Sequence, residues 1–132
     1  MFFAWDITIL ANTLETSPKT QILKITTGVI TRLDIKFPAG CHGMVKVRIL
    51  KSEFQLVPLS KGEWVTGDGE PVLTQPNYEV TGPPTELKFI GCSPGTIYNH
   101  VITVRINIER AKEEAATTLS NTLKRLLDRL GV

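Results

Sequence analysis

Ile102-Thr103-Val104-Arg105-Ile106-Asn107-Ile108 alternates apolar and polar side chains without a break. A β-strand places successive side chains on opposite faces, so the apolar residues share one face and the polar residues the other. This pattern is typical of a sheet that lies on a hydrophobic core with one face and meets water with the other. The seven residues therefore predict a fold built from half-buried β-strands.

The same period of two recurs towards the N-terminus, over 3–9, 29–37 and 45–49. Shorter strands are expected over 22–25, 54–57, 64–66, 78–81 and 87–90. The inward-facing residues should be Phe3, Trp5, Ile7, Ile9, Val29, Leu33, Ile35, Phe37, Val45, Val47 and Ile49. Prolines and glycines interrupt the segment 53–84, so only short strands fit there. Because no helical pattern separates the strands, we expect a mainly β domain, an antiparallel β-sandwich or jelly roll, over residues 1–109.

The period changes at about Arg110. Apolar residues then recur at spacings of three and four, which predicts one amphipathic α-helix over 110–132. Acidic residues lie near its start and basic residues near its end, as the helix dipole favours. The apolar stripe consists of Ala115, Leu119, Leu123, Leu126, Leu127 and Leu130.

The leucine stripe can be covered in two ways. The helix can fold back onto a face of its own sandwich, or it can bundle with copies of itself. For bundling, Leu119, Leu123, Leu126 and Leu130 approximate the a/d seam of a coiled coil and are the candidate subunit contacts. About two heptads are short for an independent coiled coil, so bundling would need support from the sandwich. Both alternatives stay open at this point.

Composition excludes several classes of function. The chain has 132 residues, with 15 Lys and Arg against 13 Asp and Glu. Its net charge of +2 provides no concentrated electrostatic field for binding nucleic acid.

No apolar run approaches the roughly 20 residues that cross a bilayer. The start, with Asp6 interrupting the apolar residues, does not resemble a signal peptide. We therefore expect synthesis in the cytoplasm, with Cys41 and Cys92 as free thiols; a bridge between their loops is the alternative.

No catalytic, cofactor-binding or metal site is predicted. Cys41, His42, Cys92 and His100 are the ligand types that zinc prefers, but their spacing matches no zinc motif. The acidic glycine-rich segment 67–70 lacks the ladder of oxygen ligands of a calcium loop. Two histidines at loop or strand ends offer no nucleophile, base and carboxylate trio. We expect the chain not to be an enzyme.

Aromatic residues in the turn-rich segments suggest one binding role. Trp64, Tyr78 and Tyr98 lie among turn residues, and Trp64 has glycines on both sides. An exposed Trp64 could stack on a sugar ring; alternatively it anchors its loop on the sandwich by burying its large ring. A carbohydrate-binding module is therefore the alternative function.

Several stretches together resemble a family of virus proteins. These are 24–30 with 37–47, then 53–58, 62–68 and 99–106. Their turns and core positions are similar to those of small β-sandwich virion proteins of tailed bacteriophages, of the decoration or cement type. The resemblance implies a non-enzymatic, multi-copy structural protein of the virion. Its expected partners are further copies of itself and other virion subunits.

Overall fold

The computed structural model describes residues 1–110, 123–127 and 129. Within them, ten strands form two sheets, and every strand pair is antiparallel. The strands are β1 (Phe2–Ile9), β2 (Lys19–Lys24), β3 (Gly28–Lys36), β4 (Lys46–Lys51), β5 (Phe54–Val57), β6 (Val65–Thr66), β7 (Pro71–Thr74), β8 (Tyr78–Val80), β9 (Glu86–Cys92) and β10 (His100–Glu109).

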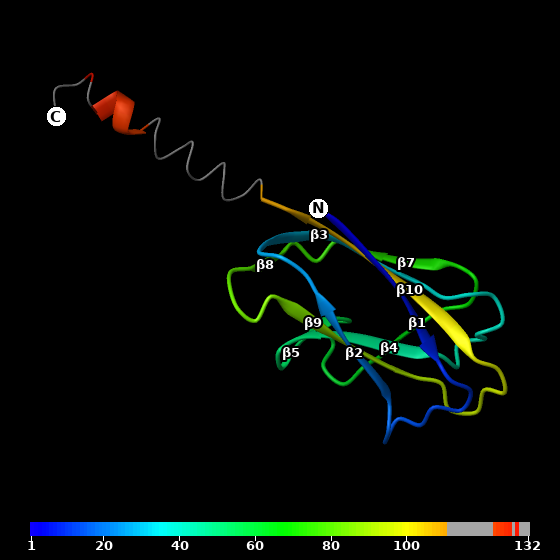
Figure 1. Ribbon diagram of the computed structural model, residues 1–132. Coiled ribbons are helices and arrows are strands. Elements are labelled where there is room, and N and C mark those ends of the chain that lie inside the picture. Colours follow the sequence, from blue (N-terminus) through cyan, green and yellow to red (C-terminus); the bar gives the residue numbers. More distant parts are fainter. Residues whose placement is uncertain (111–122, 128, 130–132) are drawn as a thin grey trace.

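The strand order is that of a jelly roll. One sheet runs β1-β10-β3, with β7 and β8 both paired to the far side of β3. The other runs β2-β9-β4, with β5 and β6 both paired to the far side of β4. If β7 and β8 are counted as one interrupted strand, and β5 and β6 as another, each sheet has four strands. The eight strands then have the order of a double Greek key. Figure 1 shows the two layers facing one another. The mainly β sandwich that the alternation predicts is confirmed.

The hydrophobic core lies between the two sheets. All four predicted inward residues of β10 are 0 % exposed, namely Ile102, Val104, Ile106 and Ile108. The predicted pattern also holds in β1, where Ile7 and Ile9 are buried, and in β4. Alternation identified these residues because it reflects the pleat of the backbone rather than the neighbouring strands.

Two predictions about strands need correction. Ile30, not Val29, faces the core, because the pairing of β3 with β10 shifts between Asn107 and Ile108 and leaves Thr31 as the extra residue. Such a bulge reverses the alternation on its far side. Strand β7 was not predicted, because Pro71 lies within it; the strand is at the sheet edge, where a missing N–H is tolerated.

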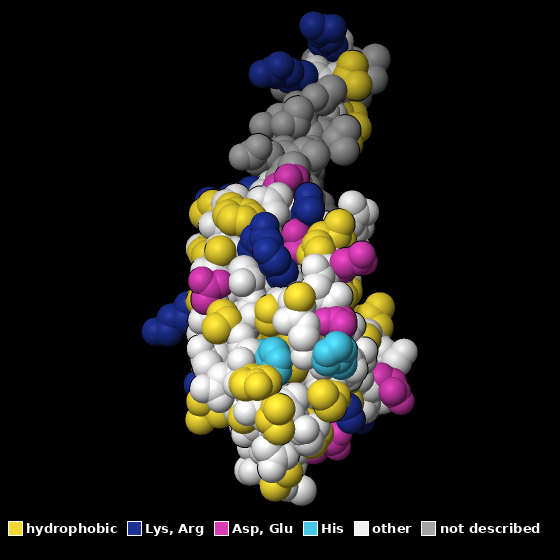
Figure 2. Space-filling model, turned by 90° about the vertical axis from the view of Figure 1, so that its right-hand side faces the viewer, with side chains coloured by type: hydrophobic (Ala, Val, Ile, Leu, Met, Phe, Trp, Pro, Cys, Tyr) yellow, Lys and Arg dark blue, Asp and Glu magenta, His cyan; other side chains and the backbone are white. Residues whose placement is uncertain are grey.

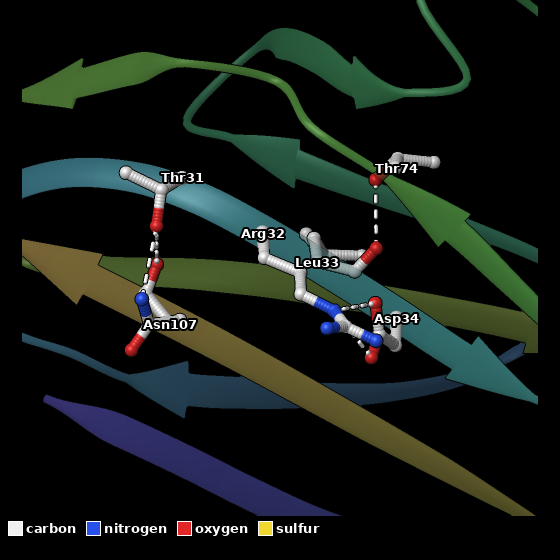
Figure 3. A network of polar contacts seen from close by, with 6 residues as sticks. All are labelled: Thr31, Arg32, Leu33, Asp34, Thr74 and Asn107. Atoms are coloured by element: carbon white, nitrogen blue, oxygen red, sulfur yellow. Dashed lines mark hydrogen bonds and ion pairs between the residues drawn. The ribbon is translucent and has the colours of Figure 1, made fainter.

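The outer face of the β1-β10-β3 sheet is covered by polar side chains that bind one another (Figure 3). Arg32 Nε donates to both carboxylate oxygens of Asp34, at 3.0 and 3.1 Å. Asn107 Nδ2 donates to Thr31 Oγ1 at 3.0 Å. Asp34 points outward, yet it is only 6 % exposed. These four polar side chains therefore bind in pairs on the outer face.

The described part of the C-terminal helix stands apart from the sandwich in Figure 1. Residues 123–127 and 129 are helical, whereas Arg110 is not. Leu123, Leu126 and Leu127 are 58 %, 50 % and 46 % exposed. The sandwich does not cover these three leucines in this structure, and both ways of covering the stripe stay predictions. Leu119, Leu130 and the rest of the predicted helix lie outside the described residues.

Candidate binding groove at the loop end

Four connections meet at one end of the sandwich. They are the β1–β2 loop (10–18), the β3–β4 loop (37–45), the β6–β7 turn (67–70) and the β9–β10 loop (93–99). Strand β10 starts at this end and runs for 10 residues, or roughly 30 Å, to the end from which the chain continues towards the helical residues. Figure 1 shows these two ends on opposite sides of the sheets.

Hydrogen bonds join the β1–β2 loop to the β9–β10 loop, and we call this contact the first clasp. Ser93 Oγ donates to Leu10 O at 2.9 Å, and Ser93 N donates to Thr13 O at 2.8 Å. Asn12 N donates to Thr96 Oγ1 at 2.9 Å. Ser93 and Thr96 are buried. The first clasp therefore fixes the two loops relative to each other through partly buried bonds.

Asp68 joins the β6–β7 turn to the β3–β4 loop, and we call this contact the second clasp. Its Oδ1 accepts from Gly40 N at 2.8 Å, and its Oδ2 lies 3.6 Å from His42 Nδ1. Gly69 N also donates to Pro38 O at 3.3 Å. The Gly40 N–H bond, aided by His42, lowers the pKa of Asp68 below its ordinary value.

An open groove of about 640 Å³ lies between the two clasps. One wall comes from the β3–β4 loop and the other from the β9–β10 loop and the start of β10, and both are mostly apolar. The lining residues are Pro38, Ala39, Gly40, His42, Met44 and 96–101. Ile97, Tyr98 and Val101 are 78 %, 70 % and 47 % exposed. Figure 2 shows both histidines on one face, with apolar side chains around them. None of the residues that line the groove is Lys, Arg, Asp or Glu.

His100, like Thr96, is a buried polar residue of the groove wall. It is 9 % exposed. Its Nδ1 is inaccessible and has no hydrogen-bond partner within the described part of the chain. Buried polar atoms in native proteins normally have a partner, so an unpaired nitrogen in a groove wall requires an explanation.

The zinc alternative finds no support among the described residues, where no three His, Cys, Asp or Glu side chains converge. Cys41 is buried while its neighbour His42 is exposed, so the two side chains point to opposite sides. Cys41 and Cys92 are free thiols, and burial raises the pKa of each. Both side chains are 0 % exposed.

Trp64 does not line this groove. It lies half-buried against Arg48 of β4, whose guanidinium carbon is 3.6 Å from the ring centroid. Arg48 also donates to Gly62 O at 2.8 Å. One ring face of Trp64 is therefore occupied, and this geometry favours the interpretation that Trp64 anchors its loop.

A second groove, of about 510 Å³, runs along the sandwich edge between β5 and the β7–β8 segment. Phe54 and Tyr78 stack within it, with ring centroids 5.6 Å apart. Leu59 is 72 % exposed at its rim. Of the three aromatics that the sequence suggested, Tyr98 therefore lines the larger groove, Tyr78 the smaller one, and Trp64 neither.

Sequence reasoning missed most of the larger groove. Met44, Ile97 and Val101 line it, but no short-range pattern distinguishes an exposed apolar loop residue from a buried one. One signal in the sequence points to the groove. Ile97, Tyr98 and Val101 are apolar or aromatic residues close to turn residues.

Comparisons with known proteins add little to this geometry. No protein-family model matches the chain, and no curated protein matches it. Among solved structures, the Yersinia pseudotuberculosis-derived mitogen is similar, with a TM-score of 0.41 and 9 % sequence identity. The match covers 83 % of this chain and 86 % of the mitogen. No helix in the described residues is long and apolar enough to span a membrane.

Proposed function

We propose that this chain is a non-enzymatic virion structural protein that acts through self-association and through contacts with other virion subunits. The observation that supports it best is the exposure of Leu123, Leu126 and Leu127 on the helical segment. Covering such a side chain completely contributes roughly 1.5–3 kcal/mol. An assembly in which these leucines meet copies of themselves would recover that free energy.

The jelly-roll sandwich has its own complete core, so it does not need the helix as a lid. The large core side chains of both sheets, such as Leu33, Ile49 and Phe89, are 0 % exposed. Jelly rolls recur in viral capsid proteins and also in lectins. Since a fold by itself does not define a function, the helical segment carries the argument for assembly and the resemblance of the sequence carries the argument for a virion.

Sedimentation velocity on the full chain tests the self-association. We expect the parent to form a closed oligomer and the double variant Leu123→Asp/Leu126→Asp to sediment as a monomer with an unchanged thermal unfolding of the sandwich. The matched control is Leu14→Asp, because Leu14 in the β1–β2 loop is 49 % exposed, against 50 % for Leu126. This control should keep the oligomer. A parent that stays monomeric, or a double variant that keeps the oligomer, would refute the proposal.

The virion assignment has a separate test. Particles from the source culture are banded in a density gradient, and the chain is detected with an antibody raised against the purified protein. We expect it in the particle band at a constant ratio to the other particle proteins. Finding it only among free proteins would rule out a virion component even if the chain self-associates.

A further inference from the structure

We propose that the groove between the two clasps binds a neutral sugar ring of a glycan, with the ring of Tyr98 as its stacking platform. Tyr98 is 70 % exposed at the groove, so its ring offers free apolar area. An aromatic ring attracts the C–H face of a pyranose, and its hydroxyl provides a polar edge. The proposal does not depend on self-association of the helical segment.

The polar groups of the groove suit a ligand that carries hydroxyls. The imidazole of His42 is exposed, and the ring of His100 lies in the groove wall. Asn99 uses its Oδ1 to accept from Ala11 N at 2.8 Å, and its amide nitrogen makes no hydrogen bond within the described residues. Imidazole and amide groups can donate to or accept from a hydroxyl.

The same groups disfavour two other kinds of occupant. A charged ligand would find no Lys, Arg, Asp or Glu among the residues that line the groove. A wholly apolar peptide would bury the exposed Asn99 without giving its amide nitrogen a partner, which is unfavourable. A neutral sugar has both an apolar face and hydroxyls, so it matches the apolar walls and the unpaired polar groups together.

The groove is also held in shape before any ligand arrives. The first clasp fixes the wall that carries Tyr98, through the buried Ser93 and Thr96. The second clasp fixes the opposite wall, through Asp68 and Gly40. A rigid site loses less conformational entropy on binding. Its volume, about 640 Å³, is within the range of small-molecule sites.

An array of neutral and sialylated glycans, probed with the full chain, is the first experiment. The neutral glycan that binds best is then titrated by calorimetry against the parent and its variants. We expect Tyr98→Ala to weaken binding about tenfold or more. Tyr78→Ala is the matched control, since it removes the same side chain from the edge groove, and it should change the affinity by less than about twofold. The imidazole nitrogen signals of His100 should shift on titration.

Each contrary result is decisive. Binding to no neutral glycan, binding to sialylated glycans alone, or equal affinity in Tyr98→Ala and the parent would overturn the proposal. So would capture of apolar peptides at this groove with no glycan bound. The Leu123→Asp/Leu126→Asp variant should keep its affinity per chain, so a failure of self-association and a failure of glycan binding are distinguished.

Discussion

The inner face of β10 and the leucines of the helical segment are equally regular apolar patterns with opposite surroundings. Ile102, Ile106 and Ile108 are 0 % exposed, whereas Leu123 and Leu126 are 58 % and 50 % exposed. In both regions the period of the apolar residues matches the secondary structure that forms. The difference lies in the partner: β10 has a second sheet opposite it, and the helical segment has nothing from the described chain. A periodic apolar face therefore indicates that another surface must pack against it, but the period does not indicate which element provides that surface.

The largest expected loss of stability is in the buried inner face of β10. Ile106→Ala should lower the free energy of unfolding by about 2–5 kcal/mol, because it leaves a cavity between two closed sheets. Urea titration followed by tryptophan fluorescence measures it. A loss below about 0.5 kcal/mol, which is the surface range, would contradict the burial of this face.

Adding volume to the same core should cost less. A Cβ on Gly91 of β9 would lie 2.6 Å from Ile9 Cδ1 and 2.9 Å from Phe89 Cε1, both of buried residues. Gly91→Ala should therefore lower the free energy of unfolding by about 1–3 kcal/mol, through overpacking. The control is Gly82→Ala, because a Cβ there meets nothing within 4 Å. Equal stability of both variants would mean that the core holds more free space than the structure shows.

A smaller and pH-dependent effect is expected at the loop end. Because the pKa of Asp68 is lowered from 3.8, its carboxylate stabilises the fold fully above that value. The contribution is lost as the pH falls through the lowered pKa. Asp68→Ala should therefore lower the melting temperature at pH 7, and its difference from the parent should shrink below pH 3.8. A difference that grows in acid would contradict the second clasp.

The smallest effect on the free energy of unfolding is expected in the exposed leucines of the helical segment. Leu126→Ala should change the free energy of unfolding of the sandwich by less than about 0.5 kcal/mol, because the side chain is half exposed and alanine favours the helix. It should nevertheless weaken the self-association that we propose. Unfolding is followed by calorimetry and association by sedimentation at several concentrations. A large loss of sandwich stability would show that the segment packs on its own domain after all.

The candidate site was less predictable than the fold. Trp64 was the aromatic singled out for a ligand, but Arg48 covers one face of its ring. Tyr98, which the sequence named only among other aromatics, lines the larger groove. Neighbouring residues give both rings similar turn-rich surroundings. The two rings differ in what lies beside them. Arg48 of β4 packs on Trp64, whereas Tyr98 shares a groove with the β3–β4 loop, and each of these neighbours is distant in the sequence.

The sequence by itself determined most of the strands, most of the faces they bury and the presence of helix near the C-terminus; strand β7 and the inward position of Ile30 were the exceptions. These properties depend on side chains two to four residues apart, which the backbone geometry of each element relates directly. Only the tertiary structure decided the jelly-roll order, the bulge at Thr31, the two clasps and the exposure of the leucines. Ser93 and Leu10, for example, bind across 83 positions of sequence. Such contacts depend on how whole sheets pack, and no local period records which loops that packing brings together.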